Sequence, residues 1–167
     1  AAEHGHLSVV EWLHANRTEG CTTEAMDEAA YRGHLAVVEW LHVNRTEGCT
    51  LRVIDQAAYG GQLSVVEWLH YNRSEGCTKS AMDLAARNGH LGLVKWLHTN
   101  RSEGCSENAL TGAASNGFLG VLEWLCANQL PDSNYVAAAL DVTRRNNAVL
   151  EAARAECQLP VVAWLFS

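Results

Sequence analysis

The sequence predicts an all-α solenoid of stacked helix-turn-helix repeats, and three observations support this fold class. The string GHLSVVEWLH begins at Gly5 and returns with small changes at Gly33, Gly61, Gly89 and Gly117. The spacing between copies is 28 residues each time. Within each copy apolar residues fall at helical spacing, and no alternation typical of a strand occurs. We therefore expect five regular repeats followed by one degenerate repeat.

The first helix of a repeat is expected over about Thr22 to Arg32, taking the second repeat as the example. Ala25, Met26 and the pair Ala29-Ala30 are small or flexible apolar residues that let a neighbouring helix approach closely. A residue with a side-chain oxygen recurs at the start of this helix, where it can cap free N–H groups. These residues are Thr22, Thr50, Thr78, Ser106 and Asn134.

The second helix follows Gly33, which suits a turn of positive φ because glycine lacks a Cβ. Leu35, Val38 and Leu41 then gather on one broad helical face. A lone hairpin cannot bury its large apolar residues on two sides, so neighbouring repeats must stack and share a core. We expect the tryptophans, which all share one register, to form the buried spine of that core. They are Trp12, Trp40, Trp68, Trp96, Trp124 and Trp164.

The regular pattern continues to about residue 128. A match to the repeat returns at Cys157, 40 residues after Gly117, so residues are inserted before a degenerate last repeat. We expect one domain over 1–167, with an insert at about 129–145 and the last repeat at about 146–167. The insert contains NYVAAALDVTRR, which reads as an extra helix that is either a cap or a contact element.

Composition excludes several classes of partner. Twelve Lys and Arg against 19 Asp and Glu give a net charge of −7, which disfavours nucleic acid. No apolar run approaches the ~18 residues of a membrane span, so no membrane insertion is expected. A targeting signal is not observable at Ala1, so the compartment has to be inferred from the cysteines.

The repeats resemble the second half of an ankyrin repeat. The segments AAYRGHLAVVEWLH and AARNGHLGLVKWLH follow the family pattern Ala-Ala-x-x-Gly-His-Leu-x-Val-Val. The family's Thr-Pro-Leu-His motif is replaced by Ala25-Met26-Asp27 and its equivalents, and the period is about five residues shorter than the usual ~33. The resemblance implies an ankyrin-like stack with shortened fingers. It also implies that the first helices line a concave side.

The spacing of the recurring cysteines and histidines does not predict a metal site, and no cofactor is expected. Equivalent positions of stacked helices lie ~10 Å apart, whereas zinc ligands bind at ~2.0 to 2.3 Å and disulfides need Cα atoms within ~7 Å. We expect free thiols packed at the loops, with the histidines bonding loop carbonyls. Free thiols favour a reducing, intracellular compartment, most simply the cytoplasm. The columns are Cys21, Cys49, Cys77 and Cys105, and His14, His42, His70 and His98.

Other repeated polar residues also favour structural roles. The resemblance places Asp27 where the family's histidine bonds neighbouring loop backbone, and we expect the same role for Asp55 and Asp83. Arginines such as Arg45 alternate with glutamates such as Glu47 and would form a surface network of small individual worth. No nucleophile with a base, phosphate loop or dinucleotide fingerprint occurs, so the sequence predicts no enzyme.

Positions that differ between the copies are candidates for recognition, because positions held constant serve the stack. Variation concentrates in the first helix and its exit, and tyrosine and arginine are enriched at binding hot spots. Solvent-facing drift is the alternative explanation. The candidate partner-binding residues are Glu28, Tyr31, Arg32, Arg52, Gln56, Tyr59, Lys79, Arg87 and Asn88.

Two functions follow from these patterns. The first is a non-catalytic scaffold that binds a protein partner through the concave first-helix face. The second is a structural subunit, because terminal repeats need polar caps and none is visible at either end. The sequence is then either a piece of a longer chain, which could carry an enzyme elsewhere, or its ends pack against a subunit or another copy.

Overall fold

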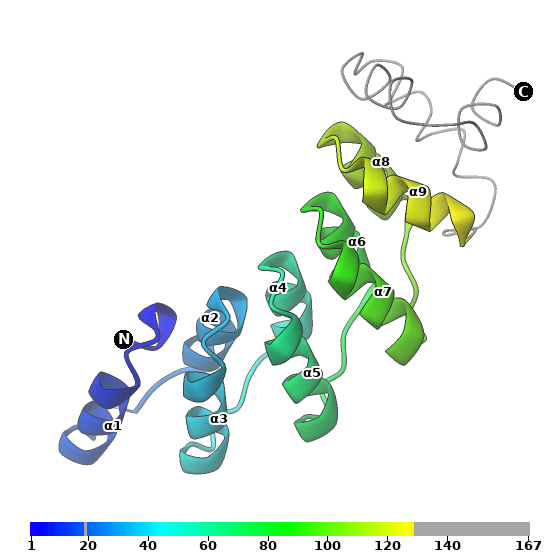
Figure 1. Cartoon of the computed structure of the whole chain (residues 1–167). Coiled ribbons are helices and arrows are strands. Elements are labelled where there is room, and N and C mark those ends of the chain that lie inside the picture. The colour runs from blue at the N-terminus through cyan, green and yellow to red at the C-terminus, as the bar shows by residue number, and fades with distance from the viewer. Residues whose placement is uncertain (19, 129–167) are drawn as a thin grey trace, which may run out of the picture. The chain divides into compact units, whose positions relative to one another are not determined.

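The computed structural model describes residues 1–18 and 20–128 (Figure 1). Throughout these residues the regular secondary structure is helical, which confirms the predicted all-α repeat fold. No helix in the described part is both long and apolar enough to cross a membrane. The expected insert at 129–145, the degenerate repeat at 146–167 and Asn134 lie outside the described residues, as do Cys157 and Trp164.

Each repeat contributes a first and a second helix, joined by a short turn. The first helices are α2 (Glu24–Arg32), α4 (Val53–Tyr59), α6 (Lys79–Arg87) and α8 (Glu107–Ser115). The second helices are α1 (Leu7–Asn16), α3 (Leu35–Asn44), α5 (Leu63–Asn72), α7 (Leu91–Asn100) and α9 (Leu119–Ala127). A short 3₁₀ helix, η1 (Ala2–His4), precedes α1.

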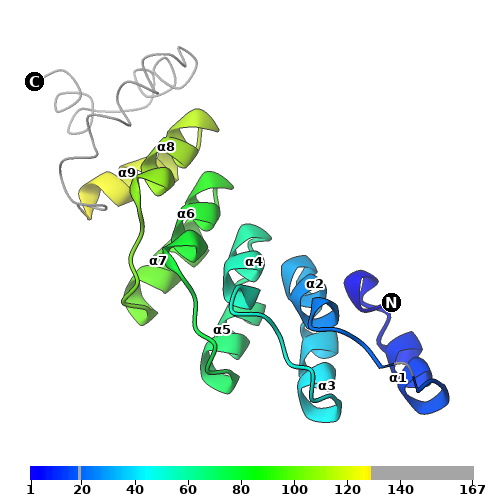
Figure 2. The same cartoon turned by 180° about the vertical axis from the view of Figure 1, so that it is seen from behind.

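The chain forms two compact units, Ala1–Ala81 and Met82–Ser167, with the boundary inside α6. In the first unit α2 packs against α4, and α3 packs against both α1 and α5 (Figure 1). First helices therefore contact first helices, and second helices contact second helices. In the second unit α9 packs against α7 and α8. Long loops lead from each second helix to the next first helix, as the view from behind shows (Figure 2).

The core is built from small and medium apolar side chains. Ala29 and Ala30 are fully buried on α2, and Val37, Val38 and Leu41 are at most 3% exposed on α3. The alanines let successive helices come close, and the branched side chains fill the space between them. The same positions are buried in the third and fourth repeats, so each repeat contributes the same layer to the core.

The tryptophans do not form the buried spine that the sequence predicts. Trp40, Trp68, Trp96 and Trp124 are half-buried, and Trp12 is 56% exposed. Adjacent helix residues point about 100° apart, so the Trp40 ring leaves the core beside Leu41. It stands edge-on to His14 of the preceding repeat, with ring centroids 5.1 Å apart. The spine therefore consists of the valines, leucines and alanine pairs.

The predicted turns and helix starts are confirmed where the structure describes them. Gly33 has φ 81°, and the equivalent glycines are also positive. The Thr78 hydroxyl accepts the Ser80 N–H at 3.0 Å, and Thr50 and Ser106 accept equivalent bonds. Thr22 is the exception: the N-cap of α2 is Thr23, and this helix has no side-chain cap.

Candidate functional site

The aspartate column ties each first helix to the loop of the next repeat. Asp55 accepts the Thr78 N–H at 2.9 Å and the Thr78 hydroxyl at 2.7 Å. Asp83 accepts the same pair of bonds from Ser106, at 2.7 and 2.5 Å. Asp27 accepts only the N–H of Thr50, at 3.0 Å. These bonds confirm the predicted structural role of the aspartates, because each carboxylate accepts hydrogen bonds from the next repeat of the stack.

A second network joins each second helix to the loop that follows the second helix of the next repeat. In the loop after α3, Arg45 forms an ion pair with Glu47 through two nitrogens, one of them Nε at 3.1 Å. The same guanidinium donates to Nδ1 of His14, one repeat earlier, at 3.1 Å. The backbone N–H of Cys21 donates to Glu47 at 3.4 Å. Three segments, α1, the loop after it and the loop after α3, are thus joined by Arg45 and Glu47.

The third repeat carries the same network. Arg73 pairs with Glu75 and donates to Nδ1 of His42 at 3.1 Å. The Cys49 thiol donates to Glu75 at 3.5 Å. The expectation that these histidines bond loop carbonyls is wrong. A guanidinium can only donate, so the Nδ1 atoms of His14 and His42 accept a hydrogen bond from an arginine instead. The expected surface network is also wrong in position, since the side chains of Arg73 and Glu75 are only 19% and 17% exposed.

These contacts set the protonation of the loop residues. The hydrogen bond from Arg45 lowers the pKa of Glu47 to about 2. Burial, followed by the charge of Glu75, raises the pKa of Cys49 to about 12. Because the thiolate is the reactive and metal-binding form, this cysteine is held in its inert state.

Neither a metal centre nor a disulfide is formed by the described residues. No group of three or more His, Cys, Asp or Glu side chains there could hold a metal ion. The cysteines of that part are free thiols, and Cys105 is buried. They are Cys21, Cys49, Cys77, Cys105 and Cys126.

Sequence reasoning missed the role of the asparagine that ends each second helix. The Nδ2 of Asn44 donates to the carbonyl of Trp40 at 2.9 Å, in the last helical turn. Asn16, Asn72, Asn100 and Asn128 make the same bond. It satisfies a carbonyl that a helix end leaves without a partner. The recurrence of Asn two residues after the His or Cys position was the available signal.

The candidate binding residues of the first compact unit include two tyrosines whose rings lie close together. The rings of Tyr31 on α2 and Tyr59 on α4 lie 5.5 Å apart between centroids, tilted by 32°. The Arg32 guanidinium lies 5.4 Å from the centroid of Tyr31 and pairs with Glu3 at 2.9 Å. We call the exposed surface around this pair the first-helix face. It comprises Glu28, Tyr31, Arg32, Arg52, Gln56, Tyr59 and Lys79.

The remaining two candidates lie in the second compact unit. Arg87 is exposed at the end of α6. Asn88 is half-buried and donates its amide to the carbonyl of Leu84 at 2.9 Å, so it closes its own helix. The asparagines that end the second helices make the same bond, but they are exposed.

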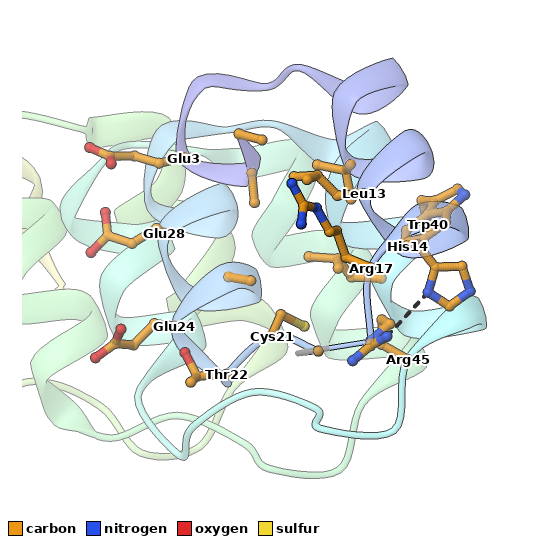
Figure 3. A pocket seen from close by; sticks show the side chains of 16 residues that line it. Glu3, Leu13, His14, Arg17, Cys21, Thr22, Glu24, Glu28, Trp40 and Arg45 are labelled. Carbon is orange, nitrogen blue, oxygen red and sulfur yellow. Dashed lines mark hydrogen bonds between the residues drawn. The ribbon is translucent and has the colours of Figure 1, made fainter.

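A cavity of about 560 Å³ opens between α1 and α2, and sequence reasoning did not predict it (Figure 3). Glu3, Glu24 and Glu28 stand in a row on one side, and Arg17, His14 and Arg45 lie on the other. The floor is apolar. Its lining includes Ala1, Ala2, Val10, Leu13, Ala25 and Leu41.

Comparison between repeats shows what this cavity is. One repeat later, the equivalent space is occupied by the first half of α2, whose Met26 is 2% exposed and whose Asp27 bonds Thr50. Thr22 stands where Thr50 stands, but no aspartate bonds it. The cavity therefore has the shape and polarity of a seat for a first helix, and we do not regard it as a small-molecule site.

The comparison with protein families identifies the repeat. The family model for ankyrin repeats (many copies) matches residues 1–42 and 54–98, which is about half of the chain. No curated protein matches the chain.

Proposed function

Because this chain belongs to the ankyrin repeat family, whose members generally mediate protein–protein interactions and are typically non-catalytic, we propose that it is a non-catalytic scaffold. It binds a protein partner through the first-helix face. In the second compact unit, Arg87 and Asn88 occupy the positions that correspond to Tyr31 and Arg32.

The observation that supports this proposal is the tyrosine pair. Tyr31 and Tyr59 are stacked before any partner arrives, and Tyr59 is 40% exposed. Stacked rings lose little conformational entropy on binding and offer a large amphipathic contact area. Arginine beside aromatic rings is typical of binding hot spots.

Some charged side chains of the described residues are paired within the stack, and others are exposed and belong to no ion pair. Arg45, Arg73 and Arg101 are paired with glutamates two residues away and serve the stack. In the part of the chain that the structure describes, no ion pair involves Glu28, Arg52 or Lys79. These exposed groups are available to a partner.

Affinity capture from the native source tests the scaffold function. The intact chain is compared with the triple variant Tyr31→Ala, Arg32→Ala, Tyr59→Ala, and circular dichroism verifies that both are folded. We expect a protein that is enriched by the intact chain and lost by the variant. The matched control is Tyr71→Ala on α5, whose side chain is 73% exposed away from this face. Retention of the partner by the triple variant contradicts the proposal.

A second function, a structural subunit that packs through the exposed apolar residues of α1, is favoured by a separate observation. Val9, Trp12 and Leu13 on α1 are 45%, 56% and 39% exposed, whereas the equivalent Val37 and Leu41 are buried. Contiguous exposed apolar residues mark interaction sites. Mass measured against protein concentration tests this function: assembly that Leu13→Ser abolishes supports it, and a monomer at every concentration contradicts it.

A further inference from the structure

The register of the first helices places equivalent side chains next to one another. Tyr31 and Tyr59 occupy the same position in adjacent repeats, and their rings touch. The same register puts Glu24 of α2 beside Arg52 at the start of α4, and Glu28 beside Gln56. Lys79 follows at the start of α6, beside Leu51, which is 70% exposed.

Charge changes sign from one first helix to the next. On α2, Glu24 and Glu28 point to the same side in one row, and both are exposed (Figure 3). On the next two helix starts the exposed charges are Arg52 and Lys79. With the neighbouring Glu24, the first-helix face is therefore acidic at α2 and basic at Arg52, which precedes α4, and at Lys79, which begins α6.

These four charges do not neutralise one another within the chain. Across the described ranges 1–18 and 20–128, none of them takes part in an ion pair, while the neighbouring Glu3 is paired with Arg32. Packed helices lie about 10 Å apart, and the Debye length at physiological salt is about 8 Å. Charges at that distance are largely screened from each other, so a partner in contact can bind each one separately.

We propose that the partner segment bound by the first-helix face carries an apolar or aromatic side chain between a basic and an acidic one. The apolar side chain packs on the tyrosine pair. The basic side chain faces Glu24 and Glu28, and the acidic side chain faces Arg52 and Lys79. The inference rests on the proposed scaffold function, and it adds the chemistry of the partner and the direction in which it lies.

A charge exchange that conserves net charge tests the direction. Peptides are selected from a random display library against the full chain and retained if Tyr31→Ala with Tyr59→Ala abolishes binding. We expect them to carry Lys or Arg on one side of an apolar residue and Asp or Glu on the other. Their affinity is then measured for the variant Glu24→Lys, Glu28→Lys, Arg52→Glu, Lys79→Glu.

The exchanged variant should bind the selected peptide about tenfold more weakly, because like charges then face each other. It should bind a peptide with Lys and Glu interchanged more tightly by a similar factor, and salt should reduce both effects. Glu39→Lys with Lys95→Glu, two exposed charges on second helices, is the matched control and should change neither affinity.

Two results would overturn the inference, and they are distinguishable. Tyrosine-dependent peptides that bind the native and exchanged chains equally well overturn the charge direction and leave the scaffold function standing. A library that yields no tyrosine-dependent peptide overturns both.

Discussion

At the scale of single residues, the invariant positions are explained by satisfied polar groups. Asp55 is 4% exposed, and its two carboxylate oxygens accept the N–H and the hydroxyl of Thr78. A hydrogen bond to a charged group contributes about 1.5 to 3 kcal/mol to stability. The column therefore holds successive repeats together, as the sequence predicts from its place in the first helix.

Asp55→Ala should destabilise the chain by about 2 kcal/mol, since it removes both hydrogen bonds that Thr78 donates to this carboxylate. Asp55→Asn should cost less, because its carbonyl can still accept the N–H. Urea unfolding followed by circular dichroism measures both. Asp27→Ala, which removes one bond at a half-buried site, is the control with a smaller expected loss. Equal stability of the Asp55→Ala and native chains would contradict this account.

A glycine is required at position 60 because the backbone of α2 lies close to it there, and not because of its φ angle. Its φ is −76°, but a Cβ there would lie 2.0 Å from the carbonyl oxygen of Tyr31. Gly60→Ala should therefore separate α4 from α2 and lower the melting temperature. Gly92→Ala on α7 is the matched control, because nothing lies within 4 Å of its Cβ position. Alanine is favoured in helices, so this control should be neutral or stabilising by up to about 1 kcal/mol. The reverse order of melting temperatures would refute the packing argument.

At the scale of an element, the string from the tryptophan to the following arginine acts as one connector. In the second repeat, Trp40 packs on His14 of the preceding repeat, and Arg45 donates a hydrogen bond to the same histidine. Asn44 donates to the carbonyl of Trp40. Each bond crosses a helix end or a repeat boundary. This explains why the string is repeated with so few changes.

The connector predicts how stability depends on pH. The arginine hydrogen bonds lower the pKa of Glu47 to about 2 and lower that of Glu75. Since the folded pKa lies below the ordinary value of about 4.3, the unfolded chain binds more protons between these values. The stabilisation is thus present above pH of about 5 and is lost as pH falls toward 2.

The urea concentration at the midpoint of unfolding, measured at roughly pH 7, 5, 4 and 3, follows this loss through the ordinary pKa of a carboxyl group. Glu75→Gln should flatten the fall below pH of about 5, because it removes one of the titrating groups. Glu39→Gln, exposed and outside the connector, is the control. An unchanged slope in Glu75→Gln would show that the ion pair contributes nothing to acid sensitivity.

The first-helix seat between α1 and α2 can be tested by filling it. A copy of residues 22–28 added before Ala1 should continue η1, fill the cavity and place an aspartate against Thr22. Filling the place of one methionine-sized side chain should stabilise by about 2 to 4 kcal/mol. The same extension with alanine in place of its aspartate should stabilise less. Thermal unfolding measures both, and no gain from either extension would disprove the assignment of the cavity.

At the scale of the whole molecule, internal repetition made much of the fold predictable. Five copies of one string defined the two helices of each repeat, the glycine turn and the hydroxyl caps, because these depend on residues near in sequence. The copies also separated constant positions from variable ones, and this selected the tyrosines and arginines proposed to bind a partner.

What the sequence by itself determined is the periodic part: the helix type, the order of the helices and the glycine turns. The structural role of the aspartates was inferred from their place in the first helix and from the resemblance to ankyrin repeats. Only the tertiary structure decided that the tryptophans lie at the rim, that His14 bonds Arg45, that Tyr31 stacks on Tyr59 and that a cavity follows α1. The reason is physical. Local pattern sets which face of a helix is apolar, but the partner of a side chain 28 residues away depends on how closely two helices approach.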